Sequence, residues 1–466
     1  MNRITIMVLF YFFLFLHAFA CDNALLRPTK VNPIRSQRSI DTSNFPQKSK
    51  NVLGKIRGFF GAIGPNIERS NVDSLFNLFL GNGIINGVFF DNGNVTFARH
   101  LIQTEKLEYE KKHDSQFSKT LLHLIKNMGL YAAGILPNPM GVANTAILQT
   151  PSGIYAMFER DLPYQIAVDF DKCSIATLGK SSVKNVPHLS GHARFHNSVI
   201  KSIDYNVKES RAFYREFDPP FSLRLSKTFD TKYMPIIHDF VATDRGTVVF
   251  ADCPFYFSGK LDQNIPVAFD TSKPTFFQVA KGGVRTILDT NQSFYIFHYG
   301  GDIAENRTHI EFYTSIYENV DFSKIDLYGK YRRFILDVGR GITTIERNSE
   351  LDQYNLDFPV KCGNYTILRN LDMAKKRING FVVCDGLDMR DAFFLENRSF
   401  CGEPAVITDA DGDNYLVGFA YGDIANESFC ILIRVLKNGC LDREYIEIPI
   451  DVDIGIGFHS AFIYGT

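Results

Sequence analysis

The chain has 466 residues, of which 45% are hydrophobic and 22% are charged, and its formal net charge at pH 7 is −1. This balance lacks the strong basic excess of a nucleic-acid-binding surface, so we expect no nucleic-acid partner. The length suits one large repeat-built domain, or two or three ordinary domains. The 42 Phe and 21 Tyr, with no Trp, favour a phenylalanine-rich β core. They are also compatible with an aromatic cavity for an apolar ligand.

The first twenty residues have the pattern of a secretory signal peptide. Arg3 supplies a positive charge, residues 7–16 form an apolar run, and Ala18 and Ala20 provide small side chains before a cleavage site at Cys21. The apolar run is short for a membrane-spanning helix. We therefore predict that residues 1–20 are a signal peptide and that the protein is secreted or lumenal.

Two further features of the sequence fit passage through the secretory pathway. The eight cysteines could form disulfides in an oxidising compartment, although the sequence does not show which would pair, and none stands in a Cys-x-x-Cys motif. Six Asn-x-Ser/Thr sequons predict a glycoprotein. They begin at Asn94, Asn291, Asn306, Asn364, Asn397 and Asn426.

Residues 21–55 form a polar segment in which Lys and Arg outnumber Asp, with little periodic pattern. Such a composition predicts a disordered, solvated arm. Two alternatives remain open for it. The arm could be a propeptide that is cleaved after Arg38, or it could lie on anionic lipid headgroups and give the protein a peripheral membrane contact.

From about residue 56 the pattern becomes that of short β-strands, and we treat residues 56–466 as a single domain. Asn86–Phe90 and Val95–Ala98 flank an Asp-Asn-Gly-Asn segment that is typical of a hairpin turn. One helix is predicted near Ser118–Met128, where leucines recur at helical spacing. Many short strands at this rhythm favour a closed all-β architecture. A β-propeller satisfies this pattern because its radial blades leave few free edges.

Four histidines stand in short motifs and together are typical of the ligand set of one non-haem iron. They are His192 in Ser-Gly-His, His238 in Ile-Ile-His-Asp-Phe, His298 in Ile-Phe-His and His459 in Gly-Phe-His-Ser. A shell of neutral imidazoles leaves the full dipositive charge on the metal and suits Fe(II) better than an oxygen-built site would. His188 and His196 flank His192 at four-residue spacing, so one of them could take its place.

These motifs, in this order, resemble those of the carotenoid cleavage oxygenase family, which includes carotenoid dioxygenases and the retinoid isomerohydrolase of the eye. The resemblance extends from about residue 56 to the end of the chain. The segment Ile-Ile-His-Asp-Phe-Val-Ala-Thr at 236–243 carries it most specifically. Supporting segments are Ala-Ile-Gly-Pro-Asn at 62–66, Phe-Glu-Arg-Asp-Leu-Pro-Tyr at 158–164, Glu-Pro at 403–404 and Gly-Phe-His-Ser at 457–460.

The resemblance implies a seven-bladed β-propeller with Fe(II) on its axis and a dome of helices and loops above the metal. It also implies carboxylates that hydrogen-bond three of the ligand imidazoles, and these fall on Glu159, Asp357 and Glu403. The family has Glu where this chain has Asp357, so we expect this shorter side chain to need a backbone shift or a bridging water. The family's acidic Asp-Gly-Asp-Gly turn has become Leu-Gly-Asn-Gly at 80–83, which implies a changed local network.

The function implied by the resemblance is an Fe(II)-dependent dioxygenase that cleaves a double bond of a carotenoid, apocarotenoid or similar apolar polyene with O2. Two alternatives stay open. One is isomerisation or isomerohydrolysis of a retinoid on the same iron scaffold, and the other is a secreted lipid-binding propeller without enzymatic activity. Retention of all four histidines favours the enzyme, because a carrier gains little from a metal site.

Overall fold

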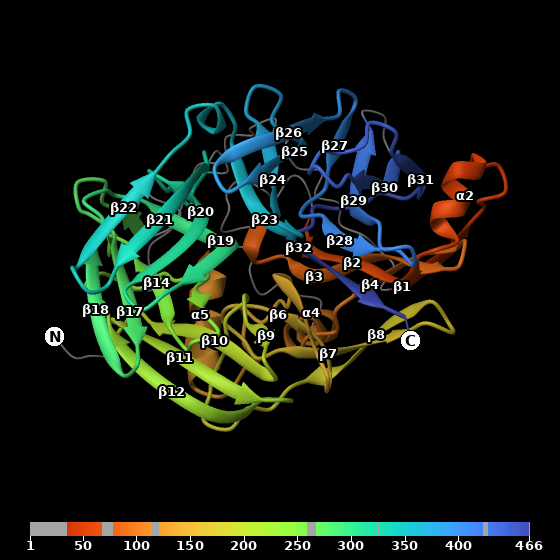
Figure 1. The fold of residues 1–466 in the computed structure, drawn as a ribbon. Coiled ribbons are helices and arrows are strands. Elements are labelled where there is room, and N and C mark those ends of the chain that lie inside the picture. The colour runs from red at the N-terminus through yellow and green to blue at the C-terminus, as the bar shows by residue number, and fades with distance from the viewer. Residues whose placement is uncertain are drawn as a thin grey trace.

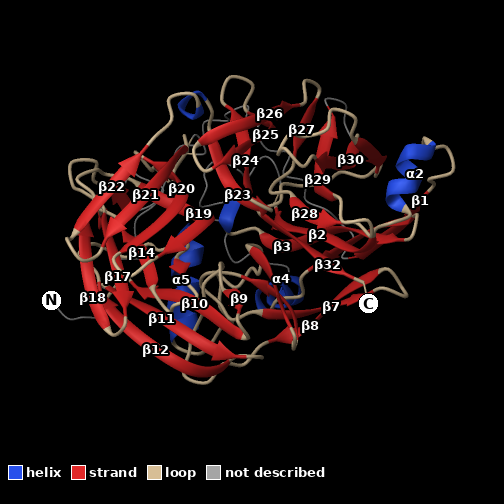
Figure 2. Cartoon of the chain, viewed as in Figure 1, coloured by secondary structure: helices blue, strands red, loops and turns tan. Residues whose placement is uncertain are grey.

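The computed structural model describes residues 35–67, 78–113, 121–258, 267–324, 327–422 and 427–465. Strands dominate this part of the chain, and they form a ring of antiparallel sheets (Figures 1 and 2). Seven of the sheets have four or five strands, which makes the molecule the predicted seven-bladed β-propeller. The signal peptide and the first part of the predicted arm lie outside the described residues.

The first four blades follow one another along the chain. Blade one contains β1 (Arg35–Ile40), β2 (Arg57–Asn66), β3 (Asn82–Asp91), β4 (Asn94–Leu101) and the distant β32 (His459–Tyr464). Blade two contains β5 (Ala146–Thr150), β6 (Gly153–Met157), β7 (Tyr164–Asp169) and β8 (Ser174–Lys180). Blade three contains β9 (Arg194–His196), β10 (Val199–Asn206), β11 (Arg211–Asp218) and β12 (Ser222–Asp230). Blade four contains β13 (Val241–Ala242), β14 (Val248–Asp252), β17 (Phe276–Lys281) and β18 (Val284–Asp289), and carries the small hairpin β15 (Phe255–Phe257) and β16 (Val267–Phe269).

The last three blades complete the ring. Blade five contains β19 (Tyr295–Glu305), β20 (His309–Tyr317), β21 (Lys330–Asp337) and β22 (Ile342–Glu346). Blade six contains β23 (Leu356–Cys362), β24 (Tyr365–Asp372), β25 (Arg377–Asp385) and β26 (Asp388–Phe394), and is preceded by the 3-10 helix η2 (Leu351–Gln353). Blade seven contains β27 (Arg398–Phe400), β28 (Ala405–Thr408), β29 (Asn414–Gly422), β30 (Ser428–Val435) and β31 (Ile446–Pro449). The pairing of β32 with β2 joins the two ends of the propeller, so the ring closes on hydrogen bonds between distant parts of the chain.

Short local signals in the sequence predicted several of these elements. The β3–β4 hairpin turns at the expected Asn-Gly pair, where Asn92 and Gly93 have φ values of 50° and 100° and Asp91 faces Asn94. The predicted helix near residues 118–128 appears as α5 (Leu121–Ala132), which follows α4 (Glu105–His113) between blades one and two. Leu107 of α4 packs with Ile84 and Leu101 of blade one.

The expectation of a disordered basic arm is wrong for residues 35–55. Strand β1 pairs with the edge of β4, and α2 (Gln47–Leu53) buries Leu53 against the core of blade one. The Arg38 guanidinium also forms an ion pair with Asp451, at 2.9 Å. An edge strand gains its stability from backbone pairing while its basic side chains stay in water, so composition alone did not reveal it.

Phenylalanine side chains fill the spaces between blades, as the composition predicted. Phe277, Phe312 and Phe334 are fully buried between blades four and five, with the last two rings stacked at a centroid distance of 5.2 Å. No two of the seven described cysteines are joined in a disulfide. None of the described helices is long and apolar enough to cross a membrane.

Candidate metal centre

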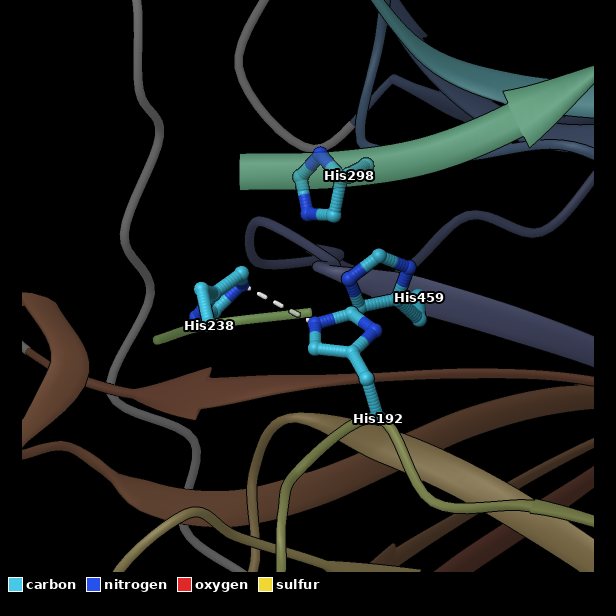
Figure 3. Close-up of side chains that lie close together, drawn as sticks. All are labelled: His192, His238, His298 and His459. Carbon is cyan, nitrogen blue, oxygen red and sulfur yellow. Dashed lines mark hydrogen bonds between the residues drawn. The ribbon is translucent and has the colours of Figure 1, made fainter. Parts of the chain in front are cut away.

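Four blades bring the four predicted histidines together, and their side chains lie close to one another (Figure 3). His192 lies two residues before β9 of blade three, and His238 lies three residues before β13 of blade four. His298 belongs to β19 of blade five, and His459 begins β32 of blade one. Each of these strands lies at one end of the strand order of its sheet. The propeller therefore places side chains from distant sequence positions at a common point.

The imidazoles are close enough to share one ion. One ring nitrogen from each histidine lies within 4.8 Å of the corresponding nitrogen of every other. The Nε2 atoms of His192 and His238 are 2.9 Å apart. The His298 side chain is buried and the other three are largely buried. Four imidazole nitrogens converging at such distances, without a carboxylate among them, form a cage of neutral donors.

The two neighbours that could have replaced His192 have other partners. His188 places its Nδ1 atom 2.7 Å from Asp204, inside blade three. His196 contacts Asp244 on the surface, where both side chains are more than half exposed. The structure therefore selects His192, of the three, for the cluster.

Each of the three predicted carboxylates contacts a different imidazole of the cluster. Glu159, which follows β6, contacts Nδ1 of His238. Asp357 of β23 lies 2.9 Å from Nδ1 of His298, and Glu403, before β28, lies 3.2 Å from Nδ1 of His459. A carboxylate that accepts the Nδ1–H group fixes the tautomer and leaves Nε2 free for a metal. His192 differs, since its ring has no carboxylate partner among the described residues.

The shorter Asp357 reaches His298 directly, and no bridging water is needed. The chain is irregular at this point, because the β23–β24 register shifts between Asp357 and Val360 and Phe358 has a φ of 56°. Tyr317 donates its hydroxyl to the same carboxylate oxygen that accepts from His298, at 2.6 Å. Sequence reasoning missed Tyr317, because its contact depends on the packing of blade five against blade six.

Burial and the carboxylates set the protonation of these rings. Burial lowers the pKa of His192 well below its usual value, and the neighbouring imidazoles lower it further. Burial also lowers the pKa of His298 and outweighs the raising effect of Asp357. In His238 the effect of burial is outweighed by Glu159, so the pKa is raised. His192 and His298 are therefore held neutral, with a lone pair available for a metal.

A network beside the cluster connects three of the segments that carry its histidines. One guanidinium nitrogen of Arg194 lies 2.7 and 2.6 Å from the two carboxylate oxygens of Asp239 and donates to the backbone carbonyl of Tyr299, at 3.1 Å. The backbone amide of Tyr299 donates to Asp239, at 2.8 Å. These residues follow His192, His238 and His298 by one or two positions, so the network fixes blades three, four and five relative to one another.

The cluster opens into a cavity of about 320 Å³ that is lined mainly by apolar and aromatic side chains. Phe297 lies against His238, with ring centroids 5.5 Å apart, and Phe358 lies against His298, at 4.3 Å. Leu78, Phe79 and Leu80, between β2 and β3, and Met140, before β5, form part of the lining. Loops between strands thus contribute to the cavity wall, and Leu80, the first residue of the altered 80–83 segment, is part of it.

A family model described as retinal pigment epithelial membrane protein matches residues 54–464. The chain belongs to this family, the carotenoid cleavage oxygenases. The match covers every strand from β2 to β32 and all seven residues of the cluster and its carboxylate partners. The family was therefore identified correctly from the histidine motifs.

Two curated relatives of this chain are dioxygenases. It is 22% identical over 486 aligned positions to the carotenoid 9,10(9',10')-cleavage dioxygenase 1 of Pisum sativum, covering 90% of this chain and 87% of the relative. It is 21% identical to the lignostilbene-alpha,beta-dioxygenase isozyme III of Sphingomonas paucimobilis, covering 87% and 91%.

Solved structures of carotenoid cleavage oxygenases share the fold. Cobalt-substituted Synechocystis apocarotenoid oxygenase superposes with a TM-score of 0.72 at 16% identity, covering 95% of this chain and 98% of that one. The lignostilbene dioxygenase of Pseudomonas brassicacearum gives a TM-score of 0.73 at 18% identity with the same coverage.

Proposed function

We propose that this chain is a non-haem Fe(II) dioxygenase that cleaves a double bond of a carotenoid, apocarotenoid or similar apolar polyene with O2. The observation that carries the proposal is the cluster of four imidazoles, three of them oriented by carboxylates, beside a mainly apolar cavity. Relatives that cleave carotenoids and lignostilbenes support the reaction class.

The donor set fits ferrous iron. Four imidazoles supply borderline nitrogen ligands, which suit Fe(II), whereas Mg²⁺ and Ca²⁺ prefer oxygen. Four protein ligands also leave positions free on a six-coordinate ion. His192, His238, His298 and His459 would hold the iron, and Glu159, Asp357 and Glu403 would fix the orientation of three of these rings. When bound, iron supplies the site at which O2 is activated.

The other residues of the cavity would hold the polyene and keep water away. Cleavage adds one oxygen atom of O2 to each carbon of the double bond and gives two carbonyl products. The rings of Phe297 and Phe358 lie against the histidines and can face positive charge that develops on the polyene. A largely apolar lining also excludes water, which would compete with substrate for the site.

Product analysis tests this proposal. Iron-loaded protein is incubated with O2 and a panel of carotenoids, apocarotenoids and stilbenes, with the His238→Ala variant as control. We expect aldehyde or ketone products that carry oxygen from O2, and none from the variant. Geometric isomers or retinols without cleavage would establish the isomerase instead, and a metal-free protein that binds polyenes without changing them would establish the carrier.

We also propose, from the signal pattern in residues 1–20, that the protein enters the secretory pathway. All five sequon asparagines among the described residues, those at 94, 291, 306, 364 and 397, are exposed and accessible to glycosylation. Sequencing of the mature N-terminus and a mobility shift on enzymatic deglycosylation test this proposal. A mature protein that still begins at Met1 and shows no mobility shift on deglycosylation would contradict it.

A further inference from the structure

The charged side chains that line the cavity differ in whether they have partners. Glu159 contacts His238, and Asp357 contacts both His298 and Tyr317. Arg160 donates to the backbone carbonyl of Tyr205, at 3.1 Å, and lies 3.6 Å from Asp204. The fourth charged residue, Arg369, forms no hydrogen bond or ion pair with any described residue. It is therefore the one charged side chain of the described lining without a direct hydrogen bond or ion pair, although Asp357 and Glu403 lie near enough to attract it electrostatically.

Arg369 lies close to the histidine cluster. It belongs to β24 of blade six, and its guanidinium carbon lies 3.8 Å from the centroid of the Phe358 ring. The same ring lies 4.3 Å from the centroid of His298 and 5.1 Å from that of His459. One aromatic ring is thus in contact with both the guanidinium and two of the imidazoles.

A role for Arg369 as the counter-ion of a neighbouring carboxylate is the main rival explanation. Asp357 stands directly opposite Arg369 in the β23–β24 ladder. One oxygen of Asp357 is already taken by His298 and Tyr317, and the other is buried without a hydrogen bond. The guanidinium does not turn to this free oxygen and lies over Phe358 instead. The geometry therefore leaves its N–H groups available to the cavity.

An unpaired guanidinium in an apolar cavity is costly unless a ligand pairs with it. Arginine stays charged at any physiological pH, and a buried charge is destabilising without a partner. Its planar fork of N–H donors matches the two oxygens of a carboxylate. Mainly apolar walls with one cationic group free to bind a ligand suit a long apolar molecule with one anionic end.

Building on the proposed function, we propose that the substrate is an apolar unsaturated molecule with a terminal carboxylate, and that Arg369 binds that carboxylate. Because Arg369 and the imidazoles contact the same ring of Phe358, the bond presented to the metal lies near the acidic end. A cavity of about 320 Å³ is at the small end of the range for such ligands, which favours a compact polyene over a full-length carotenoid.

A matched pair of probes tests the proposal without turnover. All-trans-retinoic acid and its methyl ester share one polyene and differ only in the charge of the end group. Binding of each is followed anaerobically by the absorbance of the polyene. We expect the wild-type protein to bind the acid about 10- to 100-fold more tightly than the ester, as expected for hydrogen bonds to a charged group.

Variants separate recognition from structural support. Arg369→Leu should remove the preference for the acid while leaving binding of the ester unchanged, and Arg369→Lys should retain part of the preference. Arg160→Leu removes the paired arginine of the same cavity and should leave the acid-to-ester ratio unchanged. Circular dichroism and iron content establish that each variant is folded and loaded.

Two results would overturn the proposal. One is equal affinity of the wild-type protein for acid and ester, and the other is an Arg369→Leu variant that loses both ligands equally or fails to fold while Arg369→Lys folds. Either result would make Arg369 a structural counter-charge for Asp357. Binding is measured without O2, so it does not depend on catalysis. If the protein prefers the acid but gives no cleavage products when it is incubated with O2, the result contradicts the proposed function and leaves the role of Arg369 standing.

Discussion

Asp239, the residue after His238, receives the guanidinium of Arg194, the second residue after His192, with both of its carboxylate oxygens. The Asp239 side chain is almost completely buried, at 2% exposure, whereas that of Arg194 is 34% exposed. The pair therefore fixes the two segments whose imidazoles approach one another most closely. Its geometry suggests that the cluster is held in place before a metal arrives.

Replacing Asp239 with Asn should weaken the metal site although Asp239 does not contact the imidazole cage. The change leaves Arg194 without its buried counter-charge and weakens the connection to Tyr299. We expect a fall in iron affinity of about 10- to 100-fold, comparable to loss of other residues that support metal ligands. Competitive chelation measures it. The control is Asp244→Asn, which removes an exposed carboxylate nearby. Equal iron affinity in the two variants would contradict the prediction.

Replacing Tyr317 with Phe should weaken the support of His298. The hydroxyl of Tyr317 and the ring of His298 share one oxygen of Asp357, and loss of the hydroxyl removes a donor to a buried carboxylate. The free energy of unfolding should fall by about 2 kcal/mol. Denaturant titration measures it, with iron content as a second readout. Tyr214→Phe, which removes a hydroxyl bonded to Glu216 in blade three, serves as the matched control, and its iron content should not change.

The three histidines of the 188–196 segment should differ in their effect on metal binding. His192→Ala removes a member of the cage and should lower the iron content strongly. His196→Ala removes a surface contact with Asp244 and should leave the iron content unchanged. Elemental analysis of the two purified variants compares them directly. Full iron content in His192→Ala would remove this residue from the proposed ligand set.

Removal of the metal should lower thermal stability. An ion that binds only the folded chain stabilises it by about 3 kcal/mol when its free concentration is one hundred times Kd. We expect a lower Tm after anaerobic chelation and recovery when Fe(II) is added back. The His238→Ala variant should show neither change, and a chelator-sensitive Tm in that variant would indicate a second metal site.

Deletion of residues 21–40 should destabilise blade one. Strand β1 covers the edge of β4, and its loss exposes unpaired backbone groups that favour association between chains. The deletion also removes Arg38 and its ion pair with Asp451. Light scattering and Tm report the effect, with a variant lacking only residues 21–34 for comparison. Identical behaviour of the two variants would show that β1 contributes nothing to stability.

Features carried by short contiguous motifs could be predicted from the sequence. The segment around His238 is specific enough to indicate the family, and with the family came the propeller, the histidine quartet and the carboxylate positions. Features that depend on the register of distant strands could not be predicted. The Arg194–Asp239 pair, the Tyr317 hydroxyl and the position of Arg369 over Phe358 are contacts between strands that no local pattern of residues indicates. Strand β1 was missed for a different reason, because its stability comes from backbone pairing.

The pairing of β32 with β2 gives the cluster an unusual dependence on ring closure. His459 is the first residue of β32 and stands opposite Ile63 in the ladder that joins the ends of the propeller. In a nascent or partly unfolded chain in which β32 is not paired with β2, the imidazole of His459 is not held beside the other three, even when the other blades are formed. Occupancy of the proposed iron site should therefore report whether the ring has closed, because only molecules in which β32 pairs with β2 can hold an ion through all four side chains.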